Sequence, residues 1–359
     1  MLFYLDPSLI NYSNNHPEKI TEALEDLCAA RRNGRHLIFS DAFTIKSLLT
    51  LPGLSARTHR TLSAISRKIR GKLSLFQACR IYIRLVHGTG ILTKSLDNEK
   101  TVITISVDMI KGDDLFSKPR ILVENRTDGE FYTGLAKIMI NQDRVIKGVL
   151  LNYELVAGGG SQTPREYEAL RQTEYLVYCI VDADIDYPGA PLGENTAAPI
   201  ELIEKNFPIP TKEALILNCY SAENLIHPSM IKSALNLAGT ESWFQNIEEL
   251  FTRDLWQYLA LKTKKTCADF LGESDKNSYW ASQRSFFNRP PCVPACVKKD
   301  CSIFDPVKGT TLRKIADHLN ESVANSAHLL LTDKQEIAKE WLKIKDGLLS
   351  WTCSGTRIS

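Results

Sequence analysis

The sequence predicts an α/β protein with a mostly parallel sheet flanked by helices. A small α/β domain precedes this sheet and a helical C-terminal region follows it. Short apolar strands alternate with amphipathic helices up to about residue 236, a pattern typical of parallel sheets. From residue 241 onward, apolar residues recur at helical spacing instead. The chain has 359 residues and a 43% apolar fraction, sufficient for two or three domains with a sizeable core.

Residues 1–117 are predicted to form the N-terminal α/β domain. Its expected strands are MLFYLD, RHLIFSD and TVITISVDMI, and each carries an aspartate at or near its end: Asp6, Asp41 and Asp108. The segment HPEKITEALEDLCAARRNG has the spacing of an amphipathic helix that stops at Gly34. The three aspartates are weakly similar to the acids of PIN-like nucleases, but no further acidic motif supports that activity. We therefore expect this domain to dock a partner or position nucleic acid.

The segment from Ala42 to Lys94 is predicted to be helical and strongly basic. It contains ten Lys and Arg residues and no Asp or Glu. Its densest part holds six candidate nucleic-acid-binding residues: Arg57, Arg60, Arg67, Lys68, Arg70 and Lys72. Such a surface would contact phosphates and make binding dependent on salt. A solvated helix face or a surface for an acidic protein are alternatives, which we rank lower because a candidate phosphoryl-transfer site follows.

Residues 118–240 are predicted to form the second α/β domain. The expected strands are RILVE, KGVLLNYELV, YLVYCIVDAD and EALILNCYS, with helices after Asp128, Thr163 and Pro228. Thr163 followed by Pro164 fits a helix N-terminus. Gly158, Gly159 and Gly160 follow the second strand; their spacing favours a tight turn over a phosphate-binding loop.

Acidic residues follow three of these strands. Glu124 ends the first, Asp182 and Asp184 end the third, and Glu223 follows the fourth. The carboxyl ends of parallel strands meet at one edge of a sheet, and residues i and i+2 of a strand project to the same side. Carboxylates gathered there would suit Mg²⁺ or Mn²⁺. The alternative interpretation is that these acids are helix caps and solvated loop ends.

The order of these motifs resembles the Toprim fold of topoisomerases, primases and OLD-family nucleases. That family has an acid after the first strand, a glycine-rich turn after the second and Asp-x-Asp after the third. The OLD-like branch has Glu-x-x-x-Glu/Asp first, matched by Glu124 and Asp128, and Ser-x-Glu last, matched by Ser221 and Glu223. The string YSAENLIHP is also similar to a segment of Toprim-like nucleases in bacterial phage-defence operons. The resemblance covers about residues 118 to 236.

The resemblance implies a fold, an activity and a set of site residues. The fold would be a Toprim-like sheet, and the activity Mg²⁺- or Mn²⁺-dependent endonuclease cleavage of DNA, or less favoured RNA, in anti-phage defence. The metal ligands and catalytic acids would be Glu124, Asp128, Asp182, Asp184 and Glu223. A catalytic lysine is also expected downstream, for which Lys262 is the candidate in the site and Lys345 the alternative.

The resemblance also implies a partner. OLD proteins carry an ATPase motif in the same chain and this sequence has none, so a separate ABC- or SMC-type ATPase subunit is expected. Two other functions stay open: a non-catalytic assembly or nucleic-acid-binding subunit with a Toprim-like fold, and a primase-like polymerase. No primase zinc module or helicase-binding module supports the polymerase.

Residues 241–359 are predicted to be helical, apart from a proline-rich loop with cysteines. Cys292, Cys296 and Cys301 have the spacing C-x3-C-x4-C, and a structural Zn²⁺ needs four such ligands. Cys267, His318 or Cys353 are candidates for the fourth. The alternative is a loop with cysteines that bind no metal.

The remaining expectations concern location and assembly. Nine cysteines, mostly in apolar segments, favour buried thiols in a reducing cytoplasm. The N-terminus has an early acid and no basic region of a secretory signal. No apolar run approaches the roughly 20 residues that span a bilayer, so no membrane partner is expected. A homo-oligomer is compatible with the sequence, which does not determine the oligomeric state.

Overall fold

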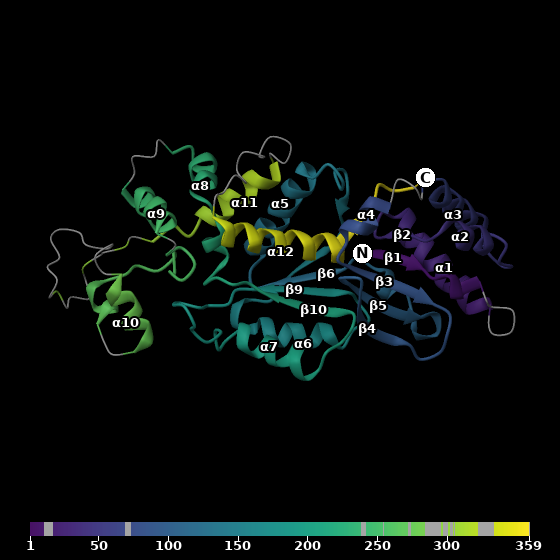
Figure 1. Cartoon of the computed structure of the whole chain (residues 1–359), viewed down its shortest axis with the longest axis horizontal. Coiled ribbons are helices and arrows are strands. Elements are labelled where there is room, and N and C mark those ends of the chain that lie inside the picture. Colours follow the sequence, from purple (N-terminus) through teal and green to yellow (C-terminus); the bar gives the residue numbers. More distant parts are fainter. Residues whose placement is uncertain are drawn as a thin grey trace.

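The computed structural model describes residues 1–10, 17–68, 73–237, 242–253, 255–271, 274–283, 296, 301, 304, 306–321 and 334–358. Three candidate site residues of the sequence analysis, Arg70, Lys72 and Cys292, lie outside these ranges. The described chain is a mixed α/β structure with two mainly parallel sheets and helices around them (Figure 1).

The first sheet belongs to the N-terminal part of the chain. Its strand order is β2-β1-β3-β5-β4, with β4 antiparallel at the edge and the other neighbours parallel. The strands are β1 (Leu2–Leu5), β2 (Leu37–Phe39), β3 (Ile81–Val86), β4 (Leu92–Asp97) and β5 (Lys100–Ser106). The helices of this part are α1 (Pro17–Arg32), α2 (Ala42–Leu48), α3 (Ala56–Lys68) and α4 (Leu73–Ala78).

The prediction that the whole basic segment is helical was wrong. Helices α2, α3 and α4 are followed by the strands β3 and β4. These strands were not predicted because the segment is rich in basic residues. In β3, five of six side chains are buried and only Arg84 is partly exposed. A nearly continuous apolar run buried on both faces is typical of a central parallel strand.

The second sheet is entirely parallel, with the order β10-β9-β6-β8. Its strands are β6 (Arg120–Val123), β8 (Glu154–Ala157), β9 (Val177–Val181) and β10 (Lys212–Ile216). The single strand predicted from KGVLLNYELV is instead two short strands. Its first part, β7 (Leu150–Leu151), pairs with the C-terminal β11 (Cys353–Ser354), and only β8 joins the parallel sheet.

Helices cover both faces of the second sheet (Figure 1). One face is covered by α5 (Arg126–Gln142) and α12 (Gln335–Thr352), and α11 (Thr311–Glu321) packs on α5. The other face is covered by α6 (Thr163–Arg171) and α7 (Ala197–Asn206). The strands alternate accordingly, because Tyr178 and Ile180 belong to the cluster with α5 and α12 whereas Val177 and Cys179 pack with α6 and α7.

The C-terminal region shares its core with the rest of the chain. Trp351 of α12 stacks on Tyr178 of β9, with ring centroids 5.9 Å apart, and one cluster of buried side chains runs from Met1 to Trp351. The other helices here are α8 (Pro228–Leu235), α9 (Ser242–Thr252) and α10 (Asp275–Ser282). The prediction that this region is helical outside its proline-rich loop was wrong for most of the described residues between α9, which ends at Thr252, and α10. None of the described helices combines the length and the apolar character that crossing a bilayer requires.

Candidate active site

The second sheet reverses its strand order between β6 and β9. From β6 the chain passes to β8 on one side, and then returns to β9 on the other side. Crevices at such a switch point, outside the carboxyl ends of the strands, are where open α/β sheets bind ligands. Glu124 follows β6 and Asp182 follows β9, and Oε1 of Glu124 accepts a hydrogen bond of 3.1 Å from the backbone N–H of Asp182. The sequence therefore places its two central acids at this switch point.

The glycine turn after β8 holds the backbone of Glu124 in place. The backbone N–H groups of Gly159 and Gly160 donate to the carbonyl oxygen of Glu124 at 2.9 and 3.2 Å. Gly159 and Gly160 have φ angles of 78° and 64°, a region that glycine enters without a steric cost. A Cβ on Gly158 would lie 2.8 Å from Cα of Thr163. The prediction of a tight turn is confirmed.

Burial and mutual repulsion dominate the electrostatics of the acids. Asp182 is 8% exposed and accepts a 3.1 Å hydrogen bond from the hydroxyl of Tyr132. Burial, and then the charges of Glu124 and Asp128, raise the pKa of Asp182 well above its ordinary value. Burial also raises the pKa of Glu124 to about 7, with the charges of Asp184 and Asp128 adding to the effect. Neighbouring carboxylates that raise one another's pKa form a site that favours a bound cation.

Asp184 lies in a loop of unusual backbone conformation. Strand β9 ends at Val181, so the expectation that Asp182 and Asp184 project together as strand residues was wrong. Asp184 has a φ of 54°, and its backbone N–H donates to the carbonyl of Tyr220 at 3.1 Å. A Cβ on Gly193 would lie 2.6 Å from the Asp184 side chain, so only glycine fits against it. The pKa of Asp184 is raised by burial, whereas the charge of Lys262 lowers it.

Asp128 has two roles in the structure. It lies in the first turn of α5, where its carboxylate accepts from the backbone N–H of Asn125 at 3.1 Å as part of a capping box. The helix-cap alternative therefore holds for this residue. Asp128 is nevertheless only 5% exposed, and burial followed by the charge of Glu223 raises its pKa to about 6. The cap thus also adds a buried carboxylate to the acidic group.

Glu223 belongs to the short helix η6 (Ala222–Leu225), beyond the end of β10. Its Oε2 accepts a 2.9 Å hydrogen bond from the Ser221 hydroxyl, and its Oε1 lies 2.9 Å from Nζ of Lys262. Glu223 is 5% exposed. The structure therefore joins both residues of the Ser-x-Glu motif and a lysine from a distant segment.

Lys262 is the cation of the acidic group. The carboxylates of Glu223 and Asp182 raise the pKa of Lys262, although burial opposes them. Its charge also lowers the pKa values of Glu124, Asp128 and Asp184. The alternative lysine, Lys345, lies elsewhere on α12, where it pairs with Asp346 at 2.5 Å. The structure thus separates the two lysine candidates, and Lys262 is the one beside the acids.

Asn224, which the sequence analysis did not assign, connects the motif turn to the segment that carries Lys262. Its Nδ2 donates to the carbonyl oxygens of Trp256 and Leu259, the latter at 2.9 Å. The backbone N–H of Tyr220 donates to the carbonyl of Gln257 at 2.8 Å. A fully buried amide that bonds two carbonyls fixes the path of the chain, so Asn224 determines where Lys262 can reach. The position of Asn224 directly after Glu223 in the string YSAEN is the sequence signal that could have identified it.

The donor chemistry of the acids fits Mg²⁺ or Mn²⁺, because carboxylate oxygens are the ligands these ions prefer. Their arrangement is open. Within the described part of the chain, no three of these carboxylates bring their oxygens within 4.8 Å of one another. Mg²⁺ is usually held by one or two carboxylates and keeps several waters. Glu124 and Asp182 are the two acids that follow the strands of the switch point, and the hydrogen bond from the Asp182 backbone N–H to Glu124 links them.

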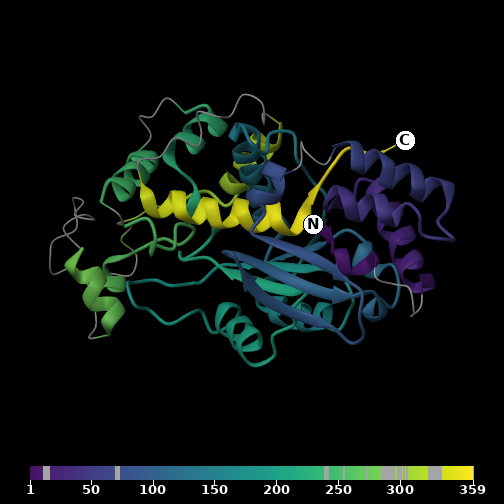
Figure 2. The same cartoon turned by 45° about the vertical axis from the view of Figure 1, so that its right-hand side comes forward.

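The basic residues of the N-terminal part lie away from the acids. Arg57, Arg60, Arg67 and Lys68 are all exposed on α3, at the opposite end of the molecule from α10 in both views (Figures 1 and 2). Helix α10 contacts the loop that carries Asp184 and Asp186, since Nε1 of Trp280 donates to the carbonyl of Asp186 at 2.8 Å. The structure does not bring the basic helix and the acids together.

Comparisons of this chain with protein-family models, with curated proteins and with solved structures found no match.

Proposed function

We propose that this chain is a metal-dependent nuclease with a Toprim-like catalytic sheet, and that the acids at the switch point hydrolyse phosphodiesters. The observation that carries this proposal is the group of five carboxylates around Lys262. Three of them, Asp128, Asp182 and Glu223, are at most 8% exposed. Charged groups in such a crowded, buried setting typically mark a functional site. The match of the motif order with the Toprim pattern supports the same conclusion.

Each residue has a defined task in this proposal. Glu124 and Asp182 bind the ion, Tyr132 orients Asp182, and Glu223 fixes the ammonium of Lys262. That ammonium would contact the phosphate and stabilise the negative charge that develops on it. A bound Mg²⁺ or Mn²⁺ supplies a Lewis acid for the phosphate and lowers the pKa of a bound water.

The biological setting is a further part of the proposal. The YSAENLIHP string supports a role in bacterial anti-phage defence, with DNA as the favoured substrate. A separate ABC- or SMC-type ATPase is the proposed partner that controls cleavage, as the resemblance implies.

One observation favours a second candidate function, a non-catalytic assembly or nucleic-acid-binding subunit. The Lys262–Glu223 ion pair already places a cation among the acids, so they are partly neutralised without a metal. In this second function the acids would be structural and α3 would provide the binding surface.

Mn²⁺ titration and cleavage measured together distinguish the two functions. The full chain is titrated calorimetrically with Mn²⁺, and then incubated with duplex DNA, single-stranded DNA and structured RNA. The proposed nuclease binds Mn²⁺ and cuts at least one substrate, whereas Asp182→Asn does neither. Asp317→Asn, an exposed aspartate of α11, is the matched control and behaves as the wild type. Mn²⁺ binding that is equal in Asp182→Asn and the wild type would favour the second function.

A further inference from the structure

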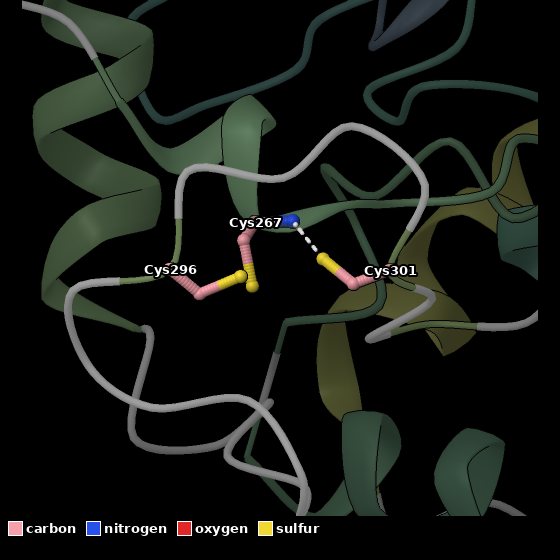
Figure 3. Close-up of side chains that lie close together, drawn as sticks. All are labelled: Cys267, Cys296 and Cys301. Atoms are coloured by element: carbon pink, nitrogen blue, oxygen red, sulfur yellow. Dashed lines mark hydrogen bonds between the residues drawn. The ribbon is translucent and has the colours of Figure 1, made fainter.

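Three cysteines from two segments of the chain lie close together (Figure 3). Cys267 begins the short helix η7 (Cys267–Phe270), and Cys296 and Cys301 come from the loop that follows α10. Their sulfur atoms all lie within 4.8 Å of one another. Of the described His, Cys, Asp and Glu residues, these are the only three that gather at such spacing.

The other expected zinc ligands lie elsewhere. Nε2 of His318 is 3.2 Å from the hydroxyl of Ser233. Sγ of Cys353 is 4.0 Å from Sγ of Cys79 and is buried against the first sheet. Of the three candidates for a fourth ligand, only Cys267 lies with Cys296 and Cys301. The third cysteine of the predicted zinc set, Cys292, lies outside the described residues.

The backbone around the three thiols is arranged as a support for them. Lys265 and Phe304 form an antiparallel bridge, with N–H···O distances of 3.2 and 3.4 Å. The N–H of Val307 donates to the carbonyl of Leu261 at 2.8 Å, which extends the pairing. Between them, the backbone N–H of Cys267 donates to Sγ of Cys301 at 3.1 Å. A hydrogen bond to sulfur favours the thiolate, which is the form that binds metals.

We propose that Cys267, Cys296 and Cys301, as thiolates, supply three of the four ligands of a tetrahedral structural Zn²⁺ ion. Thiolates at Zn–S distances of about 2.3 Å in a tetrahedron lie about 3.8 Å apart, and the observed separations allow this with small movements. Thiolate ligands select soft or borderline ions such as zinc over Mg²⁺. The carboxylates of the switch point, in contrast, suit hard ions, so the chain holds two sites of different metal preference.

The zinc site also positions Lys262, and this part of the inference rests on the proposed nuclease function. Cys267 follows Lys262 by five residues. Leu261 and Lys265, on either side of Lys262, form backbone hydrogen bonds with Val307 and Phe304, which follow Cys301 in the sequence. Asn224 holds the same segment from its other side. An ion at Cys267 would therefore fix one end of the segment that delivers the ammonium to Glu223.

The zinc content of the full chain, purified with a reductant and without chelators, tests the inference. About one zinc per chain is expected in the wild type and in the control variant Cys28→Ala. Cys28 is a buried residue of α1 and does not belong to the cluster. Cys267→Ser and Cys301→Ser should each lose most of the zinc. Replacing the zinc of the wild type by Co²⁺ should give a sulfur-to-cobalt charge-transfer band. This measurement does not depend on the folding of any variant.

Three results would overturn the inference: wild-type protein without zinc and without the cobalt band, zinc retained in both variants, or a Cys267–Cys296 disulfide in the purified protein. These readouts do not depend on cleavage. If Asp182→Asn keeps its zinc while the wild type neither binds Mn²⁺ nor cuts, the nuclease proposal fails and the zinc site stands.

Discussion

Nζ of Lys262 lies 2.9 Å from Oε1 of Glu223, and this ion pair joins the short helix η6 to the segment that follows α9. The Lys262 side chain is about half exposed, while that of Glu223 is buried. The exposed side of the ammonium can therefore meet a ligand while Glu223 holds its position. This arrangement makes Lys262 the residue whose removal should separate catalysis from folding.

Lys262→Ala should reduce the rate of cleavage by about 100-fold or more, the typical cost of removing a group that stabilises transition-state charge. Single-turnover cleavage with Mn²⁺ measures the effect. Lys345→Ala removes the alternative lysine and should leave the rate within about threefold of the wild type. An equal loss in both variants would show that Lys262 has no special role.

Mn²⁺ affinity should rise with pH between about 6 and about 7. The pKa is about 7 for Glu124 and about 6 for Asp128, because both carboxyls are buried among other acids. Only the charged carboxylates bind the ion, so protons compete with Mn²⁺ below these values. Calorimetric titration across this range measures the change, and an affinity that stays constant would contradict the assignment of Glu124 as a ligand.

Glu124→Gln should stabilise the protein above pH 7 when no divalent metal is present. The folded-state pKa of Glu124, about 7, exceeds the ordinary value of 4.5, so the folded state binds the proton more tightly. The proton on Glu124 therefore stabilises the folded wild type. This contribution is complete below pH 4.5 and is lost as the pH rises through 7. Above pH 7 the glutamate is charged in both states, and replacing it should raise the free energy of unfolding by about 3 kcal/mol.

Urea unfolding in the presence of a chelator measures this difference. Added Mn²⁺ should reduce the gap, because the ion stabilises the wild type and not the variant. A Glu124→Gln protein that is less stable than the wild type at high pH would show that the carboxylate has a stabilising partner.

Asn224→Ala should lower both stability and cleavage. The variant leaves the carbonyls of Trp256 and Leu259 without their amide donor, at a cost of about 2 kcal/mol or more for buried groups. The loop that carries Lys262 is then less well fixed. Asn277→Ala, which removes one exposed hydrogen bond to Leu271, is the control for urea unfolding and for cleavage. Wild-type cleavage by a destabilised Asn224→Ala would separate the two effects and contradict the positioning role.

The exposed arginines of α3 should contribute to nucleic-acid binding without affecting metal binding. Arg57→Ala combined with Arg60→Ala removes two exposed charges of α3, and should reduce the slope of log affinity against log salt by about 2. Fluorescence anisotropy over a range of salt concentrations measures the slope. Lys308→Ala combined with Lys314→Ala removes two exposed charges near α11 and serves as the control. An unchanged slope would contradict a role of α3 in nucleic-acid binding.

The positions of Glu124 and Asp182 could be predicted because each follows an apolar strand, and a parallel sheet brings such ends together. The contact between Lys262 and Glu223 could not be predicted, because it forms between helix η6 and a distant segment whose path depends on tertiary hydrogen bonds. Tyr132 was missed although it lies one helical turn after Asp128, where i,i+4 residues share a face. Strand β3 was missed because its flanking arginines suggested a solvated helix, whereas the burial of Ile81, Ile83 and Leu85 determined the outcome.

The central claim is that the acids at the switch point bind a divalent metal and cleave phosphodiesters. The most direct measurement is Mn²⁺-dependent cleavage by the double variant Asp182→Ala/Asp184→Ala, beside the wild type and Asp317→Asn. We predict that the wild type and Asp317→Asn cut the substrate and that the double variant does not, while it unfolds cooperatively in urea. Cleavage by the double variant at the wild-type rate would contradict the claim.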